Sequence, residues 1–152
     1  MTPQLQAFLD MIATSEGTAH IGDRGYNCLV GSTLQKPVVF PSYVDHPRVK
    51  VPLRPGLVST AAGRYQILAR YYDAYKAQLS LPDFGPASQD AIAVEMIREQ
   101  GALPDVEAGR FDEAVAKCAN IWASLPGAGY DQHENRIADL RRAFANSGGV
   151  VA

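Results

Sequence analysis

The sequence has little excess charge of either sign, few cysteines and no long apolar run. Its 152 residues carry 14 Lys and Arg against 16 Asp and Glu, a formal net charge of −2, which disfavours nucleic-acid binding through bulk positive charge. Two cysteines, Cys28 and Cys118, are too few for a disulfide scaffold, and we expect both to be free and buried. No apolar stretch approaches the roughly 20 residues of a membrane-spanning helix, so we expect a soluble chain.

The N-terminal residues MTPQLQAFLDMI lack the basic segment and the small-residue cleavage site of a secretory signal. We therefore expect synthesis in the cytoplasm. A hydrophobic fraction of 47% and a charged fraction of 20% are typical of globular proteins. The length fits one domain with its own core, and we predict a single domain over residues 1–152.

The first helix is predicted to begin with Thr2 as its N-cap and Pro3 at its first position, where a missing N–H has no cost. Leu5, Phe8, Leu9 and Ile12 follow at helical spacing and form one apolar stripe. Glu16 continues that stripe, and Gly17 can adopt the left-handed conformation that ends a helix. A carboxyl group thus lies where an apolar side chain is expected.

Prolines and glycines interrupt residues 18–60 and forbid long helices there. The segments GYNCLVG and KPVVF predict short strands joined by a turn around Gly31 and Ser32. We expect residues 41–56 to be mainly loop.

From Ala62 onward the pattern is helical. The segments that predict helices are GRYQILARYYDAYKAQL, GPASQDAIAVEMIREQG, FDEAVAKCANIW and YDQHENRIADLRRAF. The third places Trp122 on an apolar face, which favours a core position. The fourth opens with Asp131 and Glu134 at capping-box spacing, and the final NSGGVVA predicts a frayed terminus.

These elements predict one α+β domain, a helical body with a small β-rich insertion over about residues 18–60. Two lobes connected in this way tend to leave a cleft between them, and Glu16 lies at their junction. Burial and the negative end of the helix dipole both raise the pKa of a carboxyl group at that point. A partly protonated glutamate is what general acid catalysis needs, whereas the simpler alternative is a side chain that reaches water.

The segment STAAGRYQIL combines small residues with Tyr65 and Gln66. The Gln66 amide offers both donors and acceptors, which suits the hydroxyl or acetamido groups of a sugar. The alternative is an ordinary helix start that carries a polar residue.

Seven segments carry a family resemblance: AFLDMIATSEGT, GYNCLVG, STAAGRYQIL, YYDAYKAQL, SQDAIAV, GALPD and CANIWASLPGAGY. In this order they resemble the bacteriophage lambda endolysin (lambda lysozyme) family of peptidoglycan lytic transglycosylases, over about residues 7–149. The resemblance implies a lysozyme-like fold, with a helical lobe, a small β-rich lobe and a cleft.

The resemblance also implies an activity. The glutamate of the SEG segment, here Glu16, would cleave the bond between N-acetylmuramic acid and N-acetylglucosamine without water and yield a 1,6-anhydro product. The positions where the phage T4-type lysozyme pattern has an aspartate and a threonine are Gly25 and Gly31 here. Asn27 replaces an aspartate that is frequent in the lambda-like family, and an amide can serve neither as nucleophile nor as general base. Both departures favour a mechanism with one carboxylate.

The resemblance further implies a set of substrate-binding residues. Gln66 and Tyr65 match the floor of the sugar site, Tyr71 and Tyr72 replace a tandem tryptophan, and residues 125–132 form a loop at the edge of the cleft. We expect core packing to take at least one of the two adjacent tyrosines, because neighbouring helical residues point about 100° apart. The substrate-binding residues that we predict are Asn27, Ser59, Thr60, Tyr65, Gln66, Tyr72 and Tyr130.

Three other functions remain open. A hydrolytic muramidase would need a second carboxylate, with Asp23, Asp45 and Asp73 as candidates. A zinc amidase would need clustered ligands, and His20, His46 and His133 lack such spacing. A wall-binding module without activity would gain nothing from a raised glutamate pKa.

The partners that we expect are peptidoglycan glycan strands, with no nucleic acid, membrane, metal or cofactor, and we expect a monomer. The charge balance and the β-rich insertion also disfavour a helix-turn-helix DNA binder. The resemblance implies release by a holin-like membrane hole and action on the cell wall in the periplasm.

Overall fold

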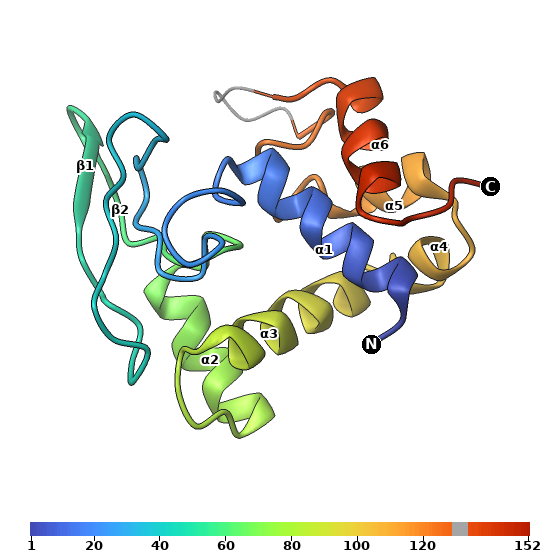
Figure 1. The fold of residues 1–152 in the computed structure, drawn as a ribbon. Coiled ribbons are helices and arrows are strands. Elements are labelled where there is room, and N and C mark those ends of the chain that lie inside the picture. Colours follow the sequence, from blue (N-terminus) through green and yellow to red (C-terminus); the bar gives the residue numbers. More distant parts are fainter. Residues whose placement is uncertain (129–133) are drawn as a thin grey trace. The chain divides into compact units, whose positions relative to one another are not determined.

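The computed structural model describes residues 1–128 and 134–152. Its elements are α1 (Pro3–Glu16), β1 (Val51–Arg54), β2 (Leu57–Ser59), α2 (Ala69–Leu79), α3 (Pro86–Glu99), α4 (Leu103–Glu107), α5 (Phe111–Cys118) and α6 (Ile137–Asn146) (Figure 1). The chain forms two compact units, unit 1 from Met1–Glu16 with Ala93–Ala152 and unit 2 from Gly17–Ile92. The prediction of one catalytic domain stays a prediction.

The first helix forms as predicted. The backbone N–H of Leu5 donates to the Thr2 hydroxyl at 3.1 Å, which caps α1. Phe8 and Ile12 on the apolar stripe are fully buried. Gly17 follows the helix with a φ of +78°, the left-handed conformation expected after a helix end.

Three phenylalanines form the centre of unit 1. The ring of Phe8 on α1 lies edge-on to the rings of Phe111 on α5 and Phe144 on α6, with centroids 6.2 and 6.4 Å away. α1 and α6 pack side by side (Figure 1). Trp122 is only 2% exposed, which confirms its predicted core position. This packing fixes the axis of the helix that carries Glu16.

The C-terminal residues are held by hydrogen bonds, so the prediction of a frayed terminus is wrong. The Ala152 N–H donates to the carbonyl of Gly109 at 2.9 Å. The Val150 N–H donates to Oε1 of Gln4, whose Nε2 donates back to the Val150 carbonyl. Gly149 lies against the Phe144 ring. The composition of the NSGGVVA segment does not indicate these partners, which lie far away in the sequence.

The last two helical segments of the prediction need correction. α6 begins at Ile137, and Glu134 precedes it and accepts the Gly127 N–H at 3.0 Å. The proposed cap Asp131 lies outside the described residues. α5 ends at Cys118, short of the predicted segment, and the short helix α4 was not predicted.

A hairpin of β1 and β2 is the sheet of unit 2, where the sequence predicted a loop. The strands pair antiparallel, with Val51 opposite Ser59 and Pro52 opposite Val58. Gly56, at a φ of +79°, lies in the connecting turn. The two strands predicted earlier in the chain are reduced to an isolated bridge between Cys28 and Val39.

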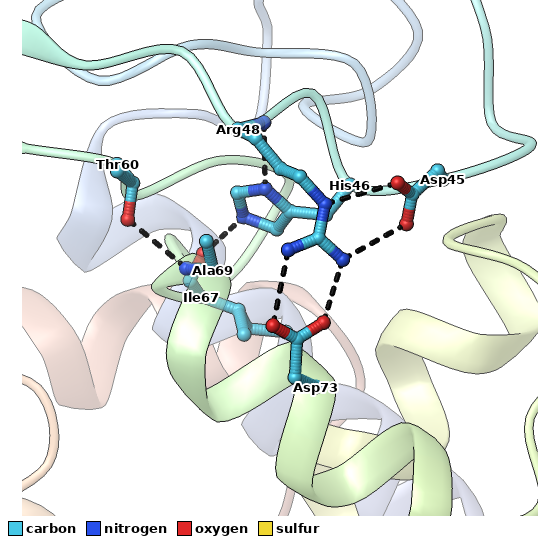
Figure 2. A network of polar contacts seen from close by, with 7 residues as sticks. All are labelled: Asp45, His46, Arg48, Thr60, Ile67, Ala69 and Asp73. Carbon is cyan, nitrogen blue, oxygen red and sulfur yellow. Dashed lines mark hydrogen bonds and ion pairs between the residues drawn. The ribbon is translucent and has the colours of Figure 1, made fainter.

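The predicted helix start at Ala62 is also wrong, because α2 begins at Ala69. A bridge joins Ala62 to Ile67 and closes a tight loop. Gln66 within this loop has a φ of +54°, which is incompatible with a right-handed helix. The hydroxyl oxygen of Thr60 accepts the Ala69 N–H at 3.0 Å and caps α2 (Figure 2). The loop therefore turns the chain before the helix can start.

The described residues contain six helices and one two-stranded sheet, in agreement with the predicted α+β class. Cys28 and Cys118 are free and buried, as predicted. Across residues 1–128 and 134–152, no helix has the length and apolar character needed to cross a bilayer.

Candidate functional site

Glu16 is the last residue of α1, and its carboxyl group lies in an enclosed environment. Burial raises its pKa from 4.5 to about 7, and a hydrogen bond from the Ser124 hydroxyl acts in the opposite direction. The partial negative charge at a helix C-terminus has the same sign of effect as burial. A carboxyl group with this pKa can give up a proton and take one back near neutral pH, as general acid and base catalysis require.

Three polar residues of unit 1 surround the end of α1. The hydroxyl oxygens of Ser15 and Ser124 are 2.8 Å apart. Nδ2 of Asn135 donates to the Ser15 carbonyl at 2.9 Å and to the Ser15 hydroxyl at 3.1 Å. The Asn135 N–H also donates to the Ser124 carbonyl at 2.8 Å. These bonds fix the segment around Ser124 against the residue that precedes Glu16.

The sequence patterns do not predict Ser15, Ser124 or Asn135 as residues of this site. Ser15 and Ser124 are separated by 109 positions, and Ser15 and Asn135 by 120. No local periodicity relates residues so far apart, and serine and asparagine are common in loops. Ser15 is the first residue of SEG and Ser124 lies within ASLPG, and membership of these two segments is the only sequence signal for either residue.

Several predicted sugar contacts lie together in unit 2. Ser59 and Thr60 precede the loop that contains Gln66, and the Gln66 amide donates to the Gly63 carbonyl at 2.9 Å. Asn27 belongs to the neighbouring segment, since the Gly63 N–H donates to the Cys28 carbonyl at 2.8 Å. The Asn27 side chain accepts the Asp23 N–H at 2.8 Å, so it also closes a local turn.

Tyr65 and Tyr72 are fully buried, and the structure does not support either ring as a sugar contact. The Tyr65 hydroxyl donates to Asp90 at 2.6 Å. The Tyr72 ring packs against His46 and Phe84, with centroids 5.8 and 5.0 Å away. Burial leaves no free ring face, so we correct the predicted set by removing both tyrosines.

Two further tyrosines, Tyr71 and Tyr130, are relevant to the predicted substrate-binding residues. Tyr71, the neighbour of Tyr72, is 45% exposed and is the member of the pair that faces solvent. The predicted contact Tyr130 lies outside the described residues.

The candidate second carboxylates, Asp23, Asp45 and Asp73, accept hydrogen bonds from other residues of unit 2. Arg48 donates to Asp45 at 3.0 and 3.2 Å and to Asp73 at 3.0 and 2.6 Å (Figure 2). These hydrogen bonds hold the pKa values of both carboxyl groups below their usual range. Asp23 accepts the Tyr43 hydroxyl at 2.7 Å.

No group of three or more possible metal ligands occurs within the part of the chain that the structure describes. His46 is buried, with one ring nitrogen against the Ile67 carbonyl and the other accepting the Arg48 N–H (Figure 2). Burial is the main reason that its pKa is lowered. His20 is exposed, and His133 lies outside the described residues.

Comparisons of the sequence with known proteins lead to a single family. The sequence model of the family named Endolysin matches residues 6–151. The chain is 50% identical to the endolysin of Escherichia phage lambda over 97% of this chain and 93% of that protein, and 49% identical to the endolysin of Escherichia phage P2 over 97% and 94%.

Solved structures give the same result and establish the lysozyme-like fold. A bacteriophage lambda lysozyme complexed with a chitohexasaccharide has a TM-score of 0.94 at 48% identity, covering 100% of this chain and 98% of the other. A second structure, a lysozyme from bacteriophage lambda, has a TM-score of 0.90 at 47% identity, covering 100% and 98%. This chain belongs to the endolysin family.

Proposed function

We propose that this endolysin cleaves the bond between N-acetylmuramic acid and N-acetylglucosamine in peptidoglycan by transglycosylation, and so lyses the host cell. The observation that carries the proposal is the Glu16 carboxyl group at the end of α1, with a pKa raised to about 7 by burial. Membership of the endolysin family supports the substrate class. The chitohexasaccharide in the related lysozyme supports a glycan as ligand.

The reaction needs one carboxyl group in two protonation states. Protonated Glu16 gives its proton to the glycosidic oxygen, and the bond from that oxygen to C1 of N-acetylmuramic acid breaks. The C6 hydroxyl of the same muramic acid then attacks C1, and Glu16 takes the hydroxyl proton. The products are a 1,6-anhydro sugar and a free 4-hydroxyl, and no water is consumed. A pKa near the working pH allows both transfers.

Four of the proposed sugar contacts belong to unit 2, namely Asn27, Ser59, Thr60 and Gln66. The fifth, Tyr130, lies outside the described residues. Ser59 and Thr60 use their oxygens to accept the N–H groups of Ala61 and Ala69. Those bonds do not use the hydroxyl protons, which can still be donated to a sugar.

A hydrolytic muramidase is the competing reaction on the same fold. It needs a second carboxylate to hold a water molecule or to act as nucleophile. Asp45 and Asp73 are both bound by Arg48, and Asp23 by Tyr43. Because these carboxylates already accept hydrogen bonds from the protein, we favour transglycosylation, which needs only the carboxyl group of Glu16.

Mass spectrometry of a peptidoglycan digest tests the proposal directly. Transglycosylation yields muropeptides that are lighter by one water than the products of a muramidase of known hydrolytic action on the same sacculi. Products of full mass with free reducing ends would select the muramidase.

Replacement of the proposed acid tests whether the protein is an enzyme at all. Glu16→Gln keeps the shape of the side chain and removes its transferable proton, so wall lysis should be lost while binding to sacculi remains. Lysis by the variant would contradict the role of Glu16. Equal binding with no lysis by either protein would indicate a wall-binding module.

We also propose that the protein works as a monomer on the cell wall in the periplasm and reaches it through a holin-like hole. Expression in bacterial cells should then cause lysis only after a membrane-permeabilising agent is added. Lysis without that agent would contradict the need for a hole, and sedimentation of the purified protein tests the monomer.

A further inference from the structure

A continuous chain of hydrogen bonds in unit 1 ends on the carboxyl group of Glu16. It begins at Nδ2 of Asn135, which lies 3.1 Å from the Ser15 hydroxyl. The Ser15 hydroxyl lies 2.8 Å from the Ser124 hydroxyl, and the Ser124 hydroxyl bonds to Glu16. We refer to Asn135, Ser15 and Ser124 as the relay. It joins three stretches of chain, namely the end of α1, the segment after α5 and the segment before α6.

The neighbouring carbonyls fix the orientation of the Asn135 amide. Nδ2 faces the Ser15 carbonyl at 2.9 Å and the Ser124 carbonyl at 3.4 Å. A carbonyl oxygen only accepts hydrogen bonds, so the nitrogen and not the oxygen of the amide must point toward them. The amide is therefore a donor toward the Ser15 hydroxyl as well.

A count of hydroxyl protons then sets the direction of the whole relay when Glu16 is ionised. A carboxylate can only accept, so the single proton of Ser124 must point to Glu16. Ser124 has no proton left for Ser15, so Ser15 donates to Ser124. Ser15 in turn accepts from Asn135. Every donor is thus aligned toward the negative charge, and aligned hydrogen bonds strengthen one another.

We propose that Asn135, Ser15 and Ser124 act as a positioning relay that stabilises the carboxylate left on Glu16 once its proton has gone to the glycosidic oxygen. The inference rests on the proposed function and deepens it. Burial keeps Glu16 protonated before the reaction, and the relay lowers the free energy of the anion that the first proton transfer creates. Dipoles already aligned at the site of developing charge need no reorganisation during the reaction.

Charged side chains do not provide this stabilisation. α1 carries Asp10 besides Glu16, and residues 119–128 carry no charged side chain. The other charged side chains among the described residues of unit 1 are Glu95, Arg98, Glu99, Asp105, Glu107, Arg110, Asp112, Glu113, Lys117, Glu134, Arg136, Asp139, Arg141 and Arg142. Burial raises the Glu16 pKa and the Ser124 hydroxyl lowers it, and no charged side chain among the described residues contributes to the shift.

The test is the pH dependence of kcat/KM on soluble glycan strands freed from peptidoglycan by an amidase. Activity needs protonated Glu16, so it falls as the pH rises through the Glu16 pKa. Ser124→Ala removes the donor to the anion and should move this fall upward by about one pH unit, with a loss of about tenfold in kcat. Ser15→Ala breaks the relay one step earlier and should give a smaller shift in the same direction.

Two controls separate the relay from packing. Ser124→Thr keeps a hydroxyl and should retain the wild-type midpoint, and Ser147→Ala changes an exposed serine outside the relay. If Ser124→Ala does not fold, Ser15→Ala provides the same test. Wild-type midpoints in Ser124→Ala and Ser15→Ala, with Glu16→Gln inactive, would overturn the relay and leave the proposed function intact. Activity of Glu16→Gln would overturn the proposed function itself.

Discussion

The guanidinium group of Arg48 donates to both carboxylate oxygens of Asp73, at 3.0 and 2.6 Å. The same group donates to both oxygens of Asp45, and the Arg48 N–H donates to His46 (Figure 2). Arg48 thus joins the segment before the hairpin to the first turns of α2. Paired charge-assisted bonds of this kind need the planar fork of arginine.

We predict that Arg48→Lys lowers the free energy of unfolding by about 1 kcal/mol, because a lysine cannot bind two carboxylates in this geometry. The measurement is urea unfolding at neutral pH. Arg142→Lys is the matched control, since Arg142 is exposed and, among residues 1–128 and 134–152, its ion pair is the local one with Asp139. An equal effect of the two substitutions would show that the Arg48 network contributes no more than an ordinary surface pair.

Gln89 should be among the most sensitive polar residues of unit 2. It is fully buried, its Nε2 donates to the carbonyls of Tyr26 and Phe84 at 2.9 and 2.8 Å, and its Oε1 accepts the Arg64 N–H at 2.9 Å. Gln89→Ala leaves three buried backbone groups without these partners, and we expect a loss of about 3 kcal/mol in unfolding free energy.

Gln6→Ala is the control for Gln89→Ala. Gln6 is exposed and makes only a local bond to Asp10 among the contacts of its side chain that the structure describes. We expect its free energy of unfolding to change by less than about 0.5 kcal/mol. A similarly small change in Gln89→Ala would mean that water replaces the lost bonds without cost.

Gly149 should not tolerate a side chain. A Cβ atom at this position would overlap the Phe144 ring. Phe144 is buried against Phe8 and Phe111, so the ring has little room to move. We predict that Gly149→Ala lowers the free energy of unfolding by about 1–3 kcal/mol. Ser147→Ala, measured in parallel by thermal unfolding, should change it little, and equal melting temperatures would contradict the close packing of the C-terminal residues.

Ionisation of Glu16 should lower the free energy of unfolding at and above neutral pH. Its pKa is raised from 4.5 to about 7 on folding, so the folded state binds more protons than the unfolded state between these values. Stability of the wild type therefore falls as pH rises from 4.5 to 7. Glu16→Gln cannot ionise, so it should be more stable than the wild type by on the order of 3 kcal/mol at pH 8, the free energy that corresponds to this pKa shift. The two proteins should be nearly equal at pH 4, and a pH-independent difference would contradict the shift.

The parts of the structure that could be predicted from sequence are those set by neighbouring residues. The cap at Thr2, the apolar stripe of α1 and the stop at Gly17 are all local, and together they placed Glu16 at a helix end. Pro86 as the first residue of α3 and Gly101 after its end, at a φ of +70°, mark that helix in the same way.

The parts that could not be predicted depend on distant partners or on unusual backbone angles. Gln66 adopts a left-handed conformation that nothing in its own type requires, and this delays α2 to Ala69. The hairpin includes Pro52, a residue that argues against a strand unless it lies at an edge. Ser124 and Asn135 reach the end of α1 only through the tertiary fold.

In the proposed reaction, Glu16 stays protonated until the glycosidic oxygen takes its proton. The most direct measurement is an NMR titration of the Glu16 side-chain carboxyl carbon, assigned by its absence in Glu16→Gln. We predict a midpoint at about pH 7. A midpoint near 4.5, the ordinary value for a glutamate, would show that Glu16 is ionised at neutral pH and cannot act as the proposed acid.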